Sequence, residues 1–298
     1  MRSKNWNALE CGKRLSAVRL LALDLDGTTL RSDGTLSERT KTALEQAAAQ
    51  GIHIVVASGR AKSALPEAVR TLKGVEYAVT SNGSSVFHLP TGERVFGLDM
   101  PDETAERLMR VLRPFGFPVE IFSEGMAYAP RAYVADPAAF GAPVRSRPYV
   151  QATRIPVDNL EALLEQHRGH VEGMDVIVPD EASKRRVREA VEALNDVYIT
   201  SSVAHYLEFG CAGASKAAGL RALAQHLHLI PAQIAAFGDA DNDWEMVTFA
   251  GVGVAMGNAC ARLKEAADIL TAANDEDGVA EVVEQLLRSY HGTGRECE

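Results

Sequence analysis

The chain has 298 residues, of which 46% are hydrophobic and 24% charged; this is ordinary globular composition and excludes a disordered or fibrous protein. This length allows one large domain or two ordinary ones, and we expect two. The net charge of −9 argues against broad binding to nucleic acid or to an anionic membrane surface, because both require a sizeable basic surface.

The sequence also bears on where the protein works. No apolar run approaches the roughly 18 residues that a membrane span needs. The polar residues 1–16 lack the apolar stretch of a secretory signal, so we expect a cytoplasmic protein. The four cysteines, Cys11, Cys211, Cys260 and Cys297, are widely scattered without a Cys-x-x-Cys pair, and we expect them to be reduced.

The first part of the chain alternates strands and helices. Residues 18–23 form a nearly continuous apolar run that predicts a buried parallel strand, with polar residues at its carboxyl end. Ser37 can cap a following helix, which Gly51 ends. Residues 52–57 and 77–79 predict two further buried strands, each followed by a polar turn. This order predicts right-handed βαβ crossovers.

The middle of the chain has α+β character. The Pro-rich residues 130–156 are its least regular part, for which we expect only loops or short strands. The other predicted elements are hairpins at 86–98 and 120–128, helices around 108–112, 158–167 and 181–194, and strands at 175–178 and 197–201.

From residue 215 onward the alternation of strands and helices resumes. The predicted elements are helices at 215–226 and 279–287 and strands at 234–237 and 252–255, with a helix between the two strands. One α/β domain interrupted by an inserted module explains this change of pattern and its return better than two domains in series. The predicted boundaries are a discontinuous core at residues 17–84 and 206–290, an inserted module at 85–205, and tails at 1–16 and 291–298.

Acidic residues cluster at two of the predicted strand ends. Asp24 and Asp26 are two residues apart, so both side chains can point to the same side of an extended strand end. Asp239 and Asp243 follow the predicted strand at 234–237. The carboxyl ends of strands in an open α/β sheet are where ligands bind, and such oxygen ligands suit Mg²⁺. Without a cation, these carboxylates would repel one another and have raised pKa values.

Other residues near these strand ends can hold a phosphate group. The amides of Gly27 and Thr28 can bind an oxyanion, and Ser58 offers a hydroxyl beside the backbone N–H groups that follow it. Lys216, at the start of a predicted helix, is the cation most suited to approach the phosphate. Once the metal and the lysine neutralise the equatorial oxygens, one carboxylate can attack phosphorus in line.

These residues resemble the motifs of the haloacid dehalogenase superfamily of phosphatases, specifically its Cof-type branch with a large α/β cap. The resemblance covers residues 18–288. The matching segments are Asp-Leu-Asp-Gly-Thr at 24–28, Ala-Ser-Gly-Arg at 57–60, Lys216, Gly-Asp-Ala-Asp-Asn-Asp at 238–243, and Val-Ala-Met-Gly-Asn-Ala at 254–259. It implies an α/β fold in which a Rossmann-like parallel-sheet core carries an inserted α+β cap.

The resemblance also implies the role of each residue and a small phosphorylated metabolite as substrate. Asp24 is the implied nucleophile, Asp26 the general acid and base, and Lys216 the cation that holds the phosphoryl group. The implied phosphate-binding residues are Gly27, Thr28, Ser58, Gly59 and Asn242. The implied Mg²⁺ ligands are Asp24, Asp239, the backbone carbonyl of Asp26, and Asp243, which supports either the metal shell or Lys216.

Simpler interpretations compete for single residues. An isolated Asp-x-Asp also occurs in metal-binding glycosyltransferases, and Lys216 could simply lie on the surface. Glu208 matches a frequently acidic position of the family, but a strand-end surface charge explains it about as well. Residues around 120–128 and 175–179 are candidates to touch the leaving group. Two other functions stay open, a phosphomutase on the same scaffold and a non-catalytic binder of phosphometabolites; the oligomeric state is unknown.

Overall fold

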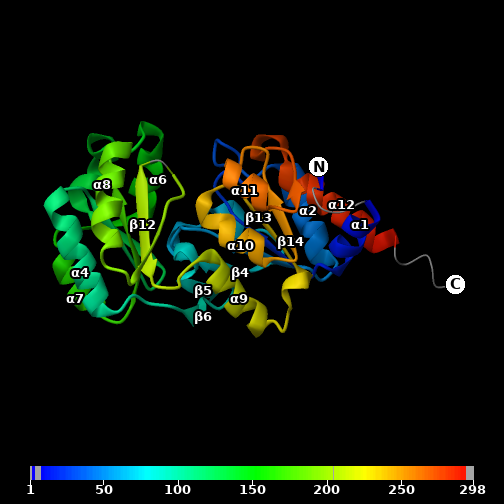
Figure 1. The fold of residues 1–298 in the computed structure, drawn as a ribbon, viewed down its shortest axis with the longest axis horizontal. Coiled ribbons are helices and arrows are strands. Elements are labelled where there is room, and N and C mark those ends of the chain that lie inside the picture. The colour runs from blue at the N-terminus through cyan, green and yellow to red at the C-terminus, as the bar shows by residue number, and fades with distance from the viewer. Residues whose placement is uncertain (1, 4–7, 204, 293–298) are drawn as a thin grey trace.

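The apolar run at residues 18–23 forms β2 (Leu20–Leu23), a central strand of the larger of two sheets, and all four of its residues are buried. The structure is a computed structural model that describes residues 2–3, 8–203 and 205–292. Its two sheets lie in two lobes side by side, the cap and the core (Figure 1).

Nine strands of the described residues form the core sheet, in the order β1-β15-β14-β13-β2-β3-β4-β5-β6. From β15 to β4 the strands are parallel, and β1, β5 and β6 extend the edges antiparallel. The other strands are β1 (Arg2–Ser3), β3 (His53–Ala57), β4 (Val75–Thr80), β5 (Ser85–His88), β6 (Glu93–Gly97), β13 (Ile234–Gly238), β14 (Val252–Ala255) and β15 (Ile269–Leu270).

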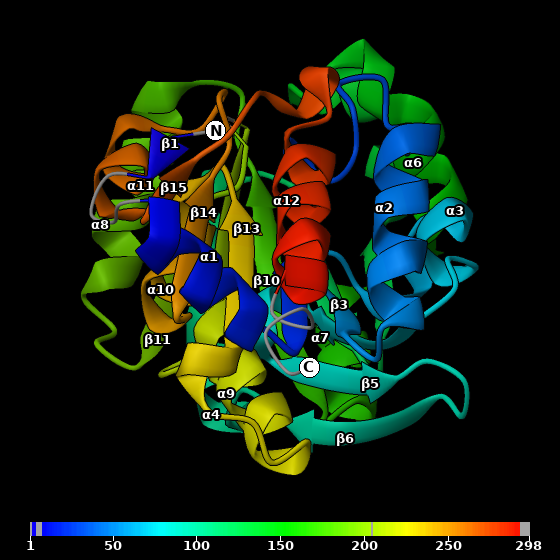
Figure 2. The same ribbon diagram turned by 90° about the vertical axis from the view of Figure 1, so that its right-hand side faces the viewer.

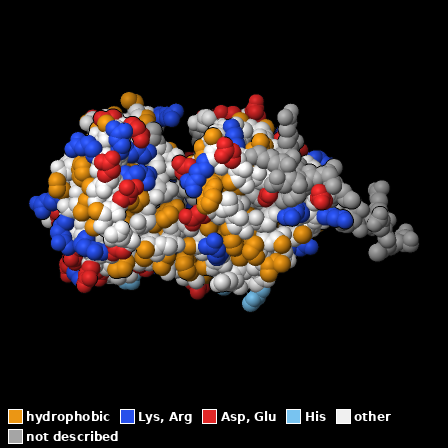
Figure 3. All heavy atoms as spheres, in the orientation of Figure 1, with side chains coloured by type: hydrophobic (Ala, Val, Ile, Leu, Met, Phe, Trp, Pro, Cys, Tyr) orange, Lys and Arg blue, Asp and Glu red, His pale blue; other side chains and the backbone are white. Residues whose placement is uncertain are grey.

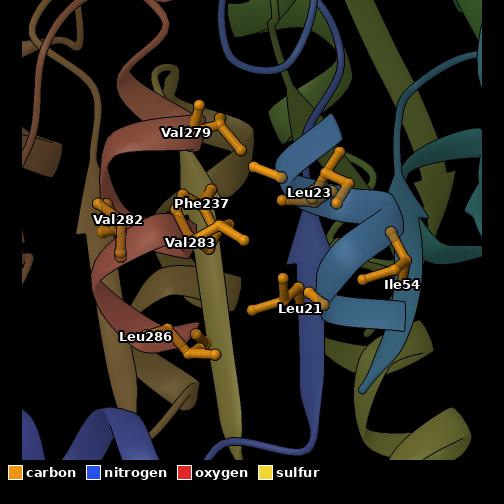
Figure 4. Packing of buried hydrophobic residues seen from close by; sticks show 14 of the residues in the cluster. Leu21, Leu23, Ile54, Phe237, Val279, Val282, Val283 and Leu286 are labelled. Carbon is orange, nitrogen blue, oxygen red and sulfur yellow. The ribbon is translucent and has the colours of Figure 1, made fainter. Parts of the chain in front are cut away.

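Helices cover both faces of this sheet, as expected for a doubly wound fold. Leu21 and Leu23 face α1 (Ala8–Ala17), α2 (Glu38–Ala49) and α12 (Gly278–Gly292), which lie next to one another in Figure 2. Figure 4 shows this packing, with Phe237 of β13 between β2 and the apolar side of α12. Burying each such large side chain contributes roughly 1.5–3 kcal/mol.

The opposite face of the core sheet packs on helices from the end of the chain. Leu20 and Ala22, which alternate with Leu21 and Leu23, contact a cluster that includes Leu220. The helices on this face are α9 (Lys216–His226) and α10 (Trp244–Phe249). Two short helices, α3 (Glu67–Arg70) and α11 (Ala261–Ala266), complete the core.

The cap contains a six-stranded sheet, in the order β11-β12-β10-β7-β8-β9. Its strands are β7 (Val119–Ser123), β8 (Met126–Pro130), β9 (Arg154–Val157), β10 (Val171–Ile177), β11 (Val197–Thr200) and β12 (Tyr206–Cys211). Three of its helices are α4 (Asp102–Leu112), α7 (Leu160–Gln166) and α8 (Glu181–Glu192). Figure 3 shows basic and acidic side chains intermixed over the cap and a notch between the lobes.

The Pro-rich residues 130–156 are more helical than predicted. Short α-helices form at α5 (Arg131–Ala135) and α6 (Arg147–Thr153), and β9 follows directly. Proline disrupts a helix interior but fits its first turn, and in α6 it stands at the start. Tyr133 of α5 is fully buried and anchors this segment under the cap sheet.

Both predicted domain boundaries are displaced. The hairpin of β5 and β6 pairs with β4, so it belongs to the core although residue 85 was the predicted start of the module. Strand β12 pairs with β10 and β11, so it belongs to the cap although residue 206 was the predicted start of the core. The pattern of a strand records which face is buried but not which strand is its neighbour.

The predicted tail at residues 1–16 is also wrong in part, because residues 8–17 form α1. Cys11 and Leu15 are buried in the core cluster against α12. Cys11, Cys211 and Cys260 are free thiols, whereas Cys297 and most of the predicted tail at 291–298 lie outside the described residues. Among the described residues, no helix is both long and apolar enough to cross a membrane.

Candidate active site

The candidate site lies where neighbouring parallel strands of the core end. Strand β2 pairs with β13 on one side and with β3 on the other, so their carboxyl ends meet at one edge of the sheet. Asp24 directly follows β2, Ser58 directly follows β3, and Asp239 directly follows β13. Residues far apart in sequence are therefore adjacent in space.

Lys216 connects the two acidic motifs. Its Nζ donates hydrogen bonds to Oδ1 of Asp24 and to Oδ1 of Asp243, each at 2.6 Å. The lysine is 1% exposed and opens α9, whose first turn is capped by the Ser215 side chain through the amide of Ala218. Burial alone lowers the pKa of the Lys216 ammonium, but Asp24 and Asp243 outweigh it and raise the pKa overall.

Three carboxylates lie together at this site. One oxygen each of Asp24, Asp239 and Asp243 lies within 4.8 Å of the others. Asp243 is held in place because its second oxygen accepts the backbone N–H groups of residues 239 and 240, at 2.9 and 3.0 Å. Asp239 is held by the hydroxyl of Thr28, which donates to its Oδ1 at 2.8 Å.

The charge balance of this cluster favours a bound cation. Burial and the neighbouring Asp243 raise the pKa of Asp24 well above its ordinary value. The same two causes raise the pKa of Asp239 to about 6. A carboxylate cluster that resists ionisation in this way is relieved by a divalent cation, and oxygen ligands are those that Mg²⁺ prefers. Asp24, Asp239 and Asp243 thus fit a hard cation.

Asp26 lies apart from these three carboxylates. Its side chain is 51% exposed, and both of its oxygens accept hydrogen bonds from Arg60, each at 2.7 Å. The guanidinium of Arg60 also lies over the ring of Tyr149 from the cap, 4.4 Å from its centroid. Asp26 and its partner Arg60 therefore face the cap.

Some polar groups of the predicted phosphate-binding residues already have partners. The amide of Thr28 donates to the carbonyl of Leu25, in addition to its hydroxyl bond with Asp239. The Ser58 hydroxyl is buried and accepts the amide of Arg60 at 3.2 Å. The Asn242 amide group donates to Asn82, and its Oδ1 is buried without a hydrogen-bond partner among the described residues.

Gly27 is required by the closeness of the two motifs. Its φ of +83° is the left-handed conformation that glycine adopts readily. A Cβ at this position would lie 2.5 Å from Oδ2 of Asp239. Gly59 is similarly close to a neighbour, since a Cβ there would lie 3.2 Å from the Asn82 side chain.

Asn82 and Arg60 also belong to the site, although the sequence assigned neither of them a role there. Asn82, in the turn after β4, accepts a hydrogen bond from Asn242 and donates one to Glu208 at 2.9 Å. Arg60 holds Asp26. The polar turn after a buried strand was a usable signal for Asn82. Glu208 is 5% exposed, so it is not the surface charge that was its simpler interpretation.

Comparison with known proteins agrees with this geometry. A family model described as haloacid dehalogenase-like hydrolase matches residues 21–283. The chain belongs to this family of haloacid dehalogenase-like hydrolases. It is 30% identical to "Phosphatase YwpJ" of Bacillus subtilis (strain 168), over 91% of this chain and 100% of the relative.

Other relatives of this haloacid dehalogenase-like hydrolase support the same conclusion. An "HMP-PP phosphatase" of Cronobacter sakazakii is 30% identical, over 83% of this chain and 86% of the relative. A solved structure of a haloacid dehalogenase-like hydrolase from B. subtilis, 28% identical, matches with a TM-score of 0.79 over 90% of this chain and 99% of that chain. The protein is a phosphatase of the Cof-type branch, with an α/β core and a cap.

Proposed function

We propose that this phosphatase hydrolyses small phosphomonoesters with Mg²⁺ as cofactor, through a phosphoryl group carried on Asp24. The observation that carries the proposal is the position of Asp24, buried directly after β2, in contact with the Lys216 ammonium and close to two further carboxylates. The relative named HMP-PP phosphatase supports a small phosphorylated compound as the substrate.

Each residue has a defined part in the first step. A carboxylate oxygen of Asp24 attacks phosphorus, and the bond from phosphorus to the leaving oxygen breaks. Lys216 binds the phosphoryl oxygens as their charge develops. Asp26 gives its proton to the leaving oxygen. Because Arg60 holds both oxygens of Asp26 here, one of them must be released for this transfer.

The second step returns the enzyme to its starting state. Asp26, now a carboxylate, takes a proton from a water molecule that attacks phosphorus. The bond between phosphorus and Asp24 breaks, and free phosphate leaves. Mg²⁺, held by Asp24, Asp239 and Asp243 and by the predicted Asp26 carbonyl, would supply charge neutralisation for the transferred group.

The proposal is tested with p-nitrophenyl phosphate and a phosphate-release assay. The wild-type protein should release phosphate with added Mg²⁺ and lose this activity with a chelator. Asp24→Asn should abolish it, whereas Glu189→Gln, a change of an exposed cap carboxylate, should not. Turnover by Asp24→Asn would overturn the proposal. So would a second assay with a sugar phosphate in which the wild type forms an isomer and no free phosphate.

A further inference from the structure

One face of the cap sheet carries a row of acids. On β7, β10 and β12, alternate residues such as Ile121, Met174 and Leu207 pack against the cap helices. The acids that alternate with them point to the opposite face. Glu208 shows that this second face is directed at the core, because it accepts a hydrogen bond from Asn82.

The strand register brings three acids of this face into line. Asp175 on β10 lies directly opposite Glu120 on β7 and directly opposite Glu208 on β12. Like charges opposite one another on neighbouring strands destabilise a sheet. All three side chains are at least nine-tenths buried, which makes the repulsion stronger than it would be in water.

The two outer acids have partners, but the central one does not. Glu120 forms a two-fold ion pair with Arg154, at 2.9 and 2.8 Å. Glu208 accepts hydrogen bonds from Asn82 and from the hydroxyl of Ser202. The Asp175 carboxyl, 8% exposed, makes no hydrogen bond or ion pair with any residue that the structure describes. Burial, Glu208 and Glu120 raise its pKa well above the ordinary value.

Asp175 borders a cavity between the cap and the candidate active site. Glu208 and Tyr198 from the cap and Gly59 and Asn82 from the core line the same cavity. Gly59 adjoins Ser58, so the cavity lies beside a predicted phosphate-binding residue. It has room for about one water molecule, so the cap must move to admit a substrate.

The positive charge of Arg154 acts on Asp175 but does not outweigh burial and the two neighbouring acids. Among the described residues that line the cavity there is no lysine, arginine or histidine. Two nearby arginines are each engaged by a carboxylate, Arg60 by Asp26 and Arg154 by Glu120. The cavity therefore offers acceptors without a free positive charge. An anionic group would be repelled there, whereas a hydroxyl or an amine would satisfy the carboxyl.

We propose that Asp175 determines specificity, by accepting hydrogen bonds from hydroxyl or amino groups of the leaving group and by excluding leaving groups that carry a carboxylate. This inference rests on the proposed phosphatase reaction and names its substrate class, a phosphomonoester whose remaining part is rich in hydrogen-bond donors and lacks a second anionic group.

Three matched pairs of substrates test the inference. They are glucose 6-phosphate and 6-phosphogluconate, glycerol 3-phosphate and 3-phosphoglycerate, and phosphoethanolamine and phosphoserine. In each pair the second member adds a carboxylate. We expect kcat/KM of the wild-type protein to be at least about tenfold higher for the first member. Equal values, or preference for the acid, would overturn the inference.

Asp175→Asn replaces the carboxyl with an amide of the same size. In this variant the ratio of kcat/KM between the first and second members of each pair should fall below about threefold. Glu189→Gln is the control and should keep the wild-type ratio. Because the substitution removes repulsion from Glu120 and Glu208, its thermal midpoint should not fall. A well-folded Asp175→Asn protein that keeps the wild-type ratio would overturn the inference.

Calorimetric binding of the same pairs to Asp24→Asn with Mg²⁺ separates this inference from the proposed reaction. Tighter binding of the first members without turnover by the wild type would count against the phosphatase reaction and support the role of Asp175. Turnover of both members with equal kcat/KM would support the phosphatase reaction and count against the role of Asp175. Binding that does not distinguish the members, or no binding of any, would overturn the role of Asp175.

Discussion

The ammonium of Lys216 donates a hydrogen bond to Asp24 at 2.6 Å, although 192 residues separate the two in the chain. Asp24 directly follows β2, in the part of the core that precedes the cap. Lys216 is the first residue of α9, the first helix after the cap. Their contact therefore joins the two halves of the discontinuous core. The same ammonium also neutralises Asp243, so one side chain balances two buried carboxylates.

Lys216→Met should therefore affect both stability and catalysis. Without Mg²⁺ at neutral pH it leaves buried carboxylates uncompensated, which we expect to cost about 3–5 kcal/mol of the free energy of unfolding. Phosphate release should fall by about 100-fold or more. Denaturant unfolding and a phosphate assay measure these effects, with Lys73→Met as the control at an exposed lysine. An unchanged unfolding midpoint would refute the structural part.

Asp239 should make the stability of the metal-free protein depend on pH. Its pKa is about 6 in the folded chain, against an ordinary value of 3.8. The folded state thus binds this proton more tightly, and the resulting stability, complete below pH 3.8, is lost as the pH rises through 6. Asp239→Asn should raise the thermal midpoint at pH 7.5 by about 2 °C or more, and by less at pH 4.5.

Scanning calorimetry with a chelator present measures this difference. An equal effect of Asp239→Asn at both pH values would contradict it. With saturating Mg²⁺ at pH 7.5 the wild type should have the higher thermal midpoint, because it then gains a ligand that Asp239→Asn binds poorly. At pH 4.5 the metal should stabilise the wild type less, since protons then compete with it for Asp24 and Asp239.

Asp26→Asn should separate the two chemical steps. It removes the proton donor, so kcat for an alkyl phosphate should fall by about 10²–10⁴-fold. The first step with p-nitrophenyl phosphate should be less affected, because its leaving group needs little protonation. Phosphorylated protein should then accumulate, which mass spectrometry detects. Asp241→Asn, at an exposed neighbouring carboxylate, is the matched control. Equal losses of the first-step rate, measured in a single turnover with each substrate, would refute the acid role.

Gly83 should be essential for the position of α9. Its φ is +94°, and a Cβ there would lie 1.8 Å from the carbonyl oxygen of Ser215, which caps the helix that Lys216 opens. Gly34 has a similar φ of +82°, but a Cβ there would meet no atom within 4 Å. Gly34→Ala therefore measures the conformational cost alone, about 1–2 kcal/mol.

Gly83→Ala adds a backbone clash to that cost and should lose at least about 4 kcal/mol of unfolding free energy. Denaturant midpoints of the two variants give the difference. Similar midpoints would show that the start of α9 can shift to make room, and would remove the requirement for glycine at this position.

Most elements of the core were predictable because their signals are local. The Ser37 side chain caps α2 by accepting the amide of Thr40, as the sequence predicted. Strands β3 and β13 likewise follow from apolar runs that end in polar turns. Residues 130–156 were less predictable, because their short helices depend on the burial of Tyr133 under the cap sheet.

The candidate site was predictable as a set of residues, but less so as a set of contacts. Asp24, Asp239 and Lys216 were assigned by motif, and the structure brings them together. The ion pair of Asp26 with Arg60 was not predicted, because its two members follow different strands and their distance depends on how those strands pair.

The sequence by itself determined the buried faces, the helix caps and the acids at the strand ends, because each depends on residues a few positions apart. Only the tertiary structure decided that Asp175 lies opposite Glu120 and Glu208 and is left without a partner among the described residues. Strand register and the approach of the two lobes set those distances, and both result from packing among segments distant in the chain.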